Sequence, residues 1–463
     1  MKKSLEIFLL SLILALAILL RLYKIDNPIA DWHSFRQADT ASVTAEFVKH
    51  GVNFLVPTYH DLSNIQSGVD NPHGFRMVEA PIFNLLHLGV YTITPSLGLD
   101  LSGRLTSVIL SLISILLLFL IARRLFDNKI ALYSAFFISV LPFSVYYSRT
   151  VLPESLLISA LLLSFYLLLI SGGRKSLICL SALSLAISVL TKPYALFFIL
   201  PHLLYFLSQL RTKKISLLWP AVYFLLALLP FVYWRYHLTL YPAGIPASDW
   251  LYNKDGIRFR PAWFRWLFGE RIGQLILGIY LTPFFFLGLS KKLTANFLYV
   301  LLWGAGILLY FSVIAGGNVQ HDYYQAVTVP FICLLLGLGL NQFFTSKTKI
   351  LVSSVAIITA LGLSAYTIKG WYQINNYAIV EAGLAADRLL PEDAKVIAPY
   401  NGDTAFLYQT RRTGWPIGYY IDDKIAKGAQ YYVSVNFDDE TNSLMKKYPV
   451  IEKNDQFVIV KLQ

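Results

Sequence analysis

The chain has 463 residues, of which 56% are hydrophobic and only 14% are charged. Soluble domains are typically about a quarter charged, so this composition excludes an ordinary soluble enzyme. The net charge of +12 does not indicate nucleic-acid binding, because the basic residues gather in short stretches between apolar runs. Cys179 and Cys333 lie inside apolar runs, which favours two buried thiols over a metal site or a disulfide framework.

Eleven apolar segments have roughly the length needed to cross a bilayer, which is about twenty residues. The first has a long apolar run over residues 7–20 with no small-residue cleavage site after it. It is therefore predicted to be a retained helix and not a signal peptide. The predicted spans are 5–23, 104–122, 130–147, 154–171, 176–191, 193–210, 215–235, 272–289, 294–315, 324–343 and 350–367.

Residues 81–97 form a further apolar stretch, which is short and interrupted by a histidine. If this stretch crossed the membrane, the topology of every later segment would be reversed. Basic residues favour cytoplasmic loops. If residues 81–97 do not cross and the N-terminus is cytoplasmic, every predicted inner loop is basic. We therefore predict an interfacial or re-entrant helix at 81–97. The inner loops then contain Arg123, Arg124, Lys129, Arg174, Lys175, Arg211, Lys213, Lys214, Lys291, Lys292, Lys347 and Lys349.

Three sizeable segments then lie on the non-cytoplasmic side: a first loop at 24–103, a second loop at 236–271, and the C-terminal tail. The predicted fold is an α-helical polytopic membrane module over residues 1–375, followed by a small outer α/β domain at 376–463. Within the tail, residues 378–390 are typical of a helix. Strands are predicted at 395–398, 431–435 and 456–461.

Polar residues cluster at the predicted outer ends of the apolar helices. The clusters lie at residues 31–40 and 78–81 of the first loop, and in turns at 146–154, 190–193 and 320–324. Ionisable groups at membrane edges are expensive and often functional. Carboxylates can act as a base, and cations can hold a phosphate. The mixture therefore suits transfer of a group from a phosphorylated donor.

The order and spacing of these motifs resemble the GT-C superfamily of glycosyltransferases, and within it the aminoarabinose transferases and protein O-mannosyltransferases. Residues 39–46, Asp-Thr-Ala-Ser-Val-Thr-Ala-Glu, occupy the place of an acidic first-loop motif, departing at its second acid and tyrosine. Residues 79–82 partly match a Pro-Pro-Leu-like motif. Arg-Leu-Thr-Ser at 104–107 and Arg-Arg-Leu-Phe at 123–126 match well, as do Ser148-Arg149 with Glu154, and Lys192. The resemblance covers residues 20–210.

The resemblance implies an inverting transferase that uses a sugar linked to polyprenyl phosphate, with the site on the periplasmic or extracellular face of the cell (inner) membrane. No metal or cofactor is expected, and the acceptor stays unidentified. The implied base is Asp39, with Glu79 and Glu154 as orienting carboxylates. The implied phosphate-binding cations are Arg149, Lys192 and Arg104. The implied substrate contacts are His33, Arg36, Tyr147, His321, Asp322 and Tyr324, and the tail and the second loop are expected to contact the acceptor.

Each of these residues has a simpler structural interpretation. Asp39 would suit the N-cap of a helix that begins near Thr40. Arg149 would suit a lipid-headgroup anchor, and Lys192 would suit a lysine that extends to the membrane surface. Residues 321–324 would suit an aromatic belt at the interface. His33 with Asp31 is a weak candidate pair for a divalent cation.

Two other classes of membrane protein remain as alternatives. A transporter or flippase of a lipid-linked glycan often shows internal repeats and broken helices with charges at mid-membrane. This sequence has no evident repeat, and its charges gather at one predicted face. A polysaccharide ligase or polymerase would share the donor type and is not separated from a glycosyltransferase by the sequence.

Overall fold

Two compact units make up the structure, a computed structural model that describes residues 3–463. We call the first the helical unit; it contains residues 3–23, 107–234 and 248–369. We call the second the loop–tail unit; it contains residues 24–106, 235–247 and 370–463. The loop–tail unit therefore contains the whole of the first loop, the start of the second and the tail, which the charge pattern predicts to lie on one side of the membrane.

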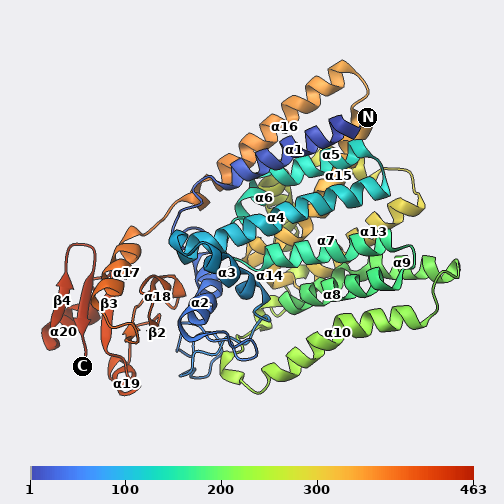
Figure 1. Ribbon diagram of the computed structural model, residues 1–463. Helices are drawn as coiled ribbons and strands as arrows, with labels where there is room; N and C mark the ends of the chain where they lie inside the picture. Colours follow the sequence, from blue (N-terminus) through green and yellow to red (C-terminus); the bar gives the residue numbers. More distant parts are fainter. Residues whose placement is uncertain (1–2) are drawn as a thin grey trace. The chain divides into compact units, whose positions relative to one another are not determined.

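The predicted spans are largely found as helices. Over residues 3–463, eight helices are long and apolar enough to cross a bilayer, and three shorter apolar helices accompany them. In Figure 1, α5 lies beside α15, and α7 lies beside α8. The elements are α1 (Lys3–Arg21), α4 (Gly98–Leu125), α5 (Asn128–Val140), α6 (Pro142–Tyr147), α7 (Glu154–Ser171), α8 (Lys175–Thr191), η2 (Pro193–Ile199), α9 (Leu200–Arg211), α10 (Leu218–Leu238), α13 (Ala295–Val313), η7 (Asp322–Thr328), α15 (Val329–Phe343) and α16 (Lys347–Ile368).

Two predicted spans are not continuous helices. The span at 130–147 breaks between α5 and α6 at Leu141, because Pro142 lacks the amide hydrogen that would continue the helix. The span at 272–289 is divided into the π-helical segment η6 (Arg265–Ile276) and α12 (Thr282–Leu289).

The break before α12 comes from close packing. Gly278 has φ +50°, and a Cβ there would lie 2.1 Å from the carbonyl oxygen of Ala360. A regular helix with a side chain at this position would collide with α16. The count of eleven spans therefore stays a prediction. The remaining short elements of the helical unit are η4 (Asp249–Leu251), η5 (Ile257–Phe259), α11 (Pro261–Phe264) and α14 (Ala315–Gln320).

The ambiguous stretch at 81–97 folds as the helix α3 (Ile82–Ile93), followed by η1 (Pro95–Leu97). Its 12 residues give a helix of about 18 Å at about 1.5 Å per residue. The hydrocarbon core of a bilayer is about 30 Å thick. The length of α3 therefore agrees with the predicted interfacial or re-entrant helix, while the side of the membrane stays a prediction.

The tail contains a five-stranded mixed sheet in the order β2-β1-β3-β5-β4. Strand β1 pairs in parallel with β2 and β3, whereas β5 pairs antiparallel with β3 and β4. All three predicted strands are found; β2 and β4 were not predicted. The tail elements are α17 (Tyr377–Leu389), β1 (Lys395–Ile397), α18 (Thr404–Gln409), β2 (Thr413–Trp415), α19 (Ile421–Ala426), β3 (Tyr431–Ser434), α20 (Asp439–Lys447), β4 (Val450–Lys453) and β5 (Val458–Lys461) (Figure 1).

The first loop and the tail share one hydrophobic core. Gly414 in β2 donates its amide to His60 O at 2.9 Å, and Leu62 donates its amide to Gly414 O at 2.8 Å. The Leu62 side chain is buried with Ile397 and Tyr432 of the sheet. The tail therefore packs as part of the loop–tail unit, and the domain boundary at 376 stays a prediction from composition. The other elements of this unit are α2 (Ser34–His50) and η3 (Pro242–Gly244), with η8 (Lys369–Tyr372) at its border.

Candidate active site

Asp39 lies in the second turn of α2, and its buried carboxylate accepts from three side chains. Arg76 Nη2 lies 2.8 Å from Asp39 Oδ2. Gln66 Nε2 donates to the same oxygen at 3.1 Å, and Thr404 Oγ1 donates to Oδ1 at 2.7 Å. A carboxylate has about four lone-pair sites. Among the hydrogen bonds of the described residues, one site on Oδ1 therefore stays open to a further donor.

Arg36 and Glu79 lie beside Asp39. The Arg36 guanidinium forms an ion pair with Glu79 Oε1, and both side chains are largely buried. These two residues line one cavity with Asp39, Arg76 and Thr40. About 10 Å³ of this cavity is open to a water-sized group. That volume holds roughly one water oxygen, or one hydroxyl oxygen of a substrate.

The structure excludes helix capping as the role of Asp39. Helix α2 begins at Ser34, with His33 at the N-cap position in the left-handed conformation. Asp39 is therefore inside the helix, where its carboxylate is directed into tertiary contacts. His33 itself forms no side-chain cap, and its ring lies 5.0 Å from that of Trp32.

Two further carboxyl groups of the loop–tail unit have pKa values raised by their surroundings. Burial raises the pKa of Asp61 to about 6, against the hydrogen bonds from Ser63 that lower it. Burial likewise raises the pKa of Asp403 to about 6, with a contribution from the negative charge of Asp39.

Arg104 and Asp31 form a separate, fully buried ion pair with Nη2 and Oδ2 3.0 Å apart. Arg104 also donates to two backbone carbonyls, those of Asn27 and Pro28. This arrangement fixes the start of the first loop and does not favour the predicted phosphate contact. Asp31 is also the acceptor for Gln37. Across residues 3–463, no group of three or more His, Cys, Asp or Glu side chains is placed to hold a metal ion.

The helical unit holds the second set of predicted residues. Glu154, the first residue of α7, lies with its Oε1 atom 3.6 Å from Lys192 Nζ. The Lys192 side chain is only 11% exposed, and that of Glu154 only 3%. Neither oxygen of Glu154 accepts a hydrogen bond from the described residues. Lys192 is therefore turned toward a buried carboxylate, which contradicts an extended lysine that reaches the surface.

Arg149 is fully buried, with its guanidinium carbon 5.6 Å from the centre of the Tyr146 ring. A headgroup anchor must expose its charge, so this alternative is wrong for Arg149. Asp322 accepts a short hydrogen bond from the Tyr147 hydroxyl and lies 3.7 Å from Arg271 Nη1.

The turn at 321–324 is not an aromatic belt. Asp322, Tyr323 and Tyr324 are each at most 7% exposed, whereas a belt residue presents its ring to lipid. The His321 ring stacks on Tyr323 with the ring centres 5.4 Å apart. The Tyr324 carbonyl accepts from the Tyr310 hydroxyl at 3.0 Å. This turn is therefore part of the packed interior of the helical unit.

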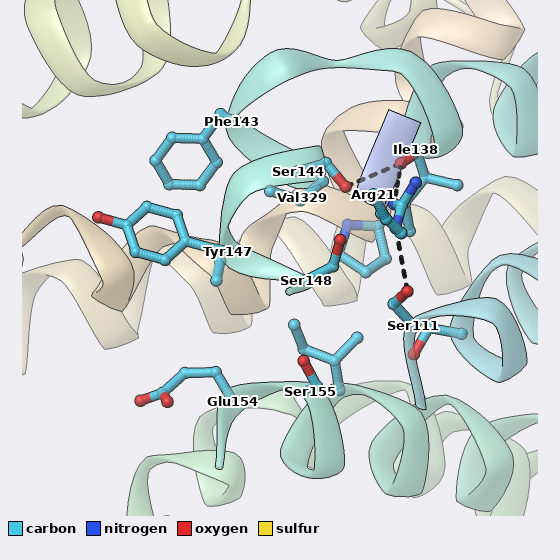
Figure 2. Close-up of a pocket in the computed structure, with 14 residues that line it drawn as sticks. Arg21, Ser111, Ile138, Phe143, Ser144, Tyr147, Ser148, Glu154, Ser155 and Val329 are labelled. Carbon is cyan, nitrogen blue, oxygen red and sulfur yellow. Dashed lines mark hydrogen bonds between the residues drawn. The ribbon is translucent and has the colours of Figure 1, made fainter. Parts of the chain in front are cut away.

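A small cavity separates Glu154 and Tyr147 from the buried Arg21. Figure 2 shows the two predicted residues at one end and Arg21 with Ser111 at the other. Serine hydroxyls line the space between them. About 40 Å³ is open to water-sized groups, enough for about two or three water molecules. Arg21 donates to Ser111 and to carbonyls of α1 and α5, so its partners are fixed protein groups.

The structure thus brings seven of the twelve predicted residues together in two sets, Asp39 with Arg36 and Glu79, and Glu154 with Lys192, Tyr147 and Asp322. The other five belong to neither set: His33, Arg104, Arg149, His321 and Tyr324. The sequence did not identify Arg76, Gln66 or Thr404 around Asp39, nor Arg271 beside Asp322. Thr404 lies 365 positions from Asp39 in the chain. No local pattern marks such a contact. The only signal for Arg76 in the sequence is its position in the first loop, close to Glu79.

A third, much larger cavity lies in the loop–tail unit, with about 880 Å³ open to water-sized groups. It is lined by α2 residues such as Glu46 and Lys49, by His60, and by tail residues such as Tyr408 and Arg412. Burial lowers the pKa of His60 to about 3, so its imidazole is neutral. Cations that line this cavity are already paired, Lys49 with Asp393 and Arg412 with Asp387. These features suit a ligand that is not strongly charged.

Comparison with known proteins supports the class that this fold and these residues define. Residues 79–234 match the family described as dolichyl-phosphate-mannose-protein mannosyltransferase. The crystal structure of ArnT from Cupriavidus metallidurans bound to undecaprenyl phosphate matches with a TM-score of 0.65 and 13% identity, over 97% of each chain. The chain therefore has the fold of the GT-C membrane glycosyltransferases, and the resemblance predicted from the sequence is confirmed.

Two further structures show the same fold. The oligosaccharyltransferase AglB from Archaeoglobus fulgidus, in complex with an inhibitory peptide and a dolichol-phosphate, matches with a TM-score of 0.57 and 12% identity, over 94% of this chain and 69% of that chain. The arabinofuranosyltransferase AftD from Mycobacteria matches with a TM-score of 0.55 and 12% identity, over 100% of this chain and 42% of that chain. A comparison with curated protein sequences gives no match.

Proposed function

We propose that this chain is an inverting glycosyltransferase that moves a sugar from a polyprenyl-phosphate donor to an acceptor hydroxyl outside the cytoplasm. The observation that carries the proposal is Asp39, a buried residue that lines a cavity of hydroxyl size and whose carboxylate keeps one open acceptor site. The fold adds support, because ArnT is seen with undecaprenyl phosphate and AglB with dolichol-phosphate.

The proposed reaction is a single displacement at the anomeric carbon. The acceptor oxygen forms a bond to this carbon while the bond from the carbon to the phosphate oxygen breaks. Asp39 takes the proton of the acceptor hydroxyl, and polyprenyl phosphate leaves with the bonding electron pair. A carboxylate placed within hydrogen-bond distance of the hydroxyl suits this role. Attack from the face opposite the phosphate inverts the anomeric configuration.

The leaving phosphate gains negative charge as the sugar departs, so fixed cations stabilise the transition state more than the ground state. We assign this role to Lys192 and Arg149. Lys192 meets Glu154 at 3.6 Å, a distance that reflects a charge interaction without a close hydrogen bond. A phosphate that enters this site would give the ammonium a second anionic partner. Glu154 then orients the lysine.

We assign acceptor binding to the large cavity of the loop–tail unit, because both the first loop and the tail contribute to its lining. Its charged groups are mostly paired, which favours a hydroxyl-rich acceptor with few charges of its own. We propose that the protein lies in the cell (inner) membrane with this unit on the periplasmic or extracellular side, an orientation that the basic loops favour.

The decisive experiment uses the Asp39→Asn variant of the full chain in detergent. Wild-type protein is incubated with a panel of radiolabelled undecaprenyl-phosphate hexoses and pentoses, with a total membrane extract as the source of acceptor. Release of undecaprenyl phosphate is counted. We expect Asp39→Asn to lower the rate by about a hundredfold to ten-thousandfold, the usual loss for a general base, while donor binding persists.

Asp70→Asn is the matched control, because it removes a salt-bridged carboxylate of the same unit that lines neither the Asp39 cavity nor the large cavity. It should keep near wild-type rates. Activity of Asp39→Asn within a few fold of wild type would move the base elsewhere, with Glu79 the next candidate. Transport of an intact lipid-linked glycan without release of undecaprenyl phosphate would favour the flippase alternative.

A further inference from the structure

The tail supplies one of the three donors to Asp39. Thr404 is the first residue of α18, and its hydroxyl donates to Asp39 Oδ1 at 2.7 Å. The residue is only 5% exposed. Among residues 3–463 it is the only donor to the oxygen that keeps an open site, since Gln66 and Arg76 both contact Oδ2. Thr404 therefore acts on the oxygen that keeps a lone-pair site for a substrate hydroxyl.

The Thr404 hydroxyl has a single hydrogen and two acceptors within reach. The backbone oxygen of Phe35 lies 3.2 Å away, and Asp39 Oδ1 lies 2.7 Å away. Hydroxyl hydrogen bonds are most often about 2.7–2.8 Å long, and those to a charged acceptor are stronger than those to a neutral one. The hydrogen is thus directed to the carboxylate, where it orients one lone pair of Oδ1.

Thr404 is itself held firmly within the loop–tail unit. The Asp403 side chain caps α18 by accepting from the Ala405 amide at 2.7 Å. The next residues along α18, Ala405 and Phe406, are fully buried. Pairing of His60 and Leu62 with Gly414 joins the first loop to the sheet that follows α18. The Thr404 hydroxyl therefore has little freedom to follow a carboxylate that moves.

We propose that Thr404 is a positioning residue for the reaction: its hydroxyl holds Asp39 so that the open lone pair of Oδ1 faces the acceptor hydroxyl. The inference rests on the proposed function of Asp39 and extends it, because it makes the tail part of the catalytic geometry as well as a candidate acceptor-binding surface. Without the hydroxyl, the Asp39 side chain retains Arg76 and Gln66 on Oδ2 but can rotate about its terminal bond.

Loss of this hydrogen bond has a second consequence. A hydrogen bond to a carboxylate favours its charged form. Its removal should move the acidic limb of the pH–rate profile to higher pH, because the base is then protonated more readily. The charged groups beside Asp39 are Arg76, Arg36, Glu79, Asp61 and Asp403, and none of them is changed by substitution at Thr404.

The test compares Thr404→Val, which has the same shape without a donor, with Thr404→Ser, which keeps the donor. Thr404→Cys is a second weak-donor variant, for use should valine impair folding. Thr410→Val is the matched control, because Thr410 is a buried threonine at the end of α18 whose hydroxyl donates only to Leu407 O. All are assayed as full chains with the undecaprenyl-phosphate donor that wild type uses.

We expect Thr404→Val to lower kcat about tenfold to a hundredfold with little change in the donor KM, and to raise the acidic limb. Thr404→Ser should return kcat to within about threefold of wild type, and Thr410→Val should match wild type. A normal kcat and pH profile in Thr404→Val would overturn the inference if Asp39→Asn is inactive. Normal activity of Asp39→Asn would instead overturn the proposed function. Equal losses in Thr404→Val and Thr410→Val would reduce Thr404 to a purely structural role and also overturn the inference.

Discussion

The two units hold their buried carboxylates in different ways. In the loop–tail unit, Asp39 accepts from Arg76, Gln66 and Thr404, so its oxygens are fixed by several donors. In the helical unit, the Glu154 oxygens accept no hydrogen bond from the described residues and meet only Lys192, at 3.6 Å. A buried charge without hydrogen bonds is costly, while one with several is held in place.

This difference matches the roles that we propose. A base must be in place before the reaction, so a rigid network around Asp39 is an advantage. A phosphate site must accept an anion and release it, so the loosely held Glu154–Lys192 pair suits a change of partner. Separate disruption of each arrangement should therefore give different signatures, and the following predictions are arranged from the largest expected effect to the smallest.

Truncation after Asn375 should have the largest effect, because it removes Thr404 and the sheet that buries Leu62. The spanning helices satisfy their own backbone hydrogen bonds and should still insert in the membrane. We expect no measurable transfer and rapid cleavage of residues 24–103 by limited proteolysis. A truncated protein with a protected first loop and normal transfer would show that the two segments fold independently.

Lys192→Ala should reduce turnover about a hundredfold, the loss that follows removal of one transition-state donor, with a smaller loss of donor affinity. The substitution also leaves Glu154 buried without its cation, which should lower the melting temperature. The double variant with Glu154→Gln should restore stability but not turnover. Lys175→Ala, at the opposite end of α8, is the control. Unchanged turnover in Lys192→Ala would remove it from the site.

Leu62→Ala should destabilise the loop–tail unit by about 2–4 kcal/mol, the usual range for a buried leucine truncated to alanine. Leu62 is 6% exposed in a core made mostly of tail residues. We expect earlier exposure of the tail in thermal proteolysis. Leu55→Ala, at a position 43% exposed, should leave the transition unchanged. An equal response of both variants would mean that the first loop and the tail do not share a core.

Asp61→Asn should change the pH dependence of stability. Burial raises the pKa of Asp61 to about 6 in the folded protein, above its usual 3.8. Between these two values the folded state keeps a proton that the unfolded state has lost. Wild-type stability should therefore fall as pH rises through this window, by at most about 3 kcal/mol from this group.

The asparagine variant avoids this loss, so its melting temperature should exceed that of wild type at pH 7 and approach it at pH 4. Melting curves of both proteins in detergent between these pH values test the prediction. A constant difference between the variants at all pH values would show that Asp61 does not titrate in this window.

The sequence by itself determined the membrane class and the α/β character of the tail. These properties depend on the composition of continuous stretches, such as the apolar run at 7–20 or the strand at 431–435. The helix α3 is a further case, because its shortness is visible in the spacing of polar residues around it. The family resemblance likewise rested on short continuous motifs.

Only the tertiary structure decided which side chains meet. Thr404 reaches Asp39 across 365 positions, and the break at Gly278 depends on the carbonyl of Ala360 in another helix. Arg104 was assigned to the phosphate by its motif, yet it is engaged by Asp31 and two backbone oxygens. Hydropathy and charge act locally along the chain. Hydrogen bonds and close packing act between whichever residues the fold brings within a few ångströms, and no local pattern records them.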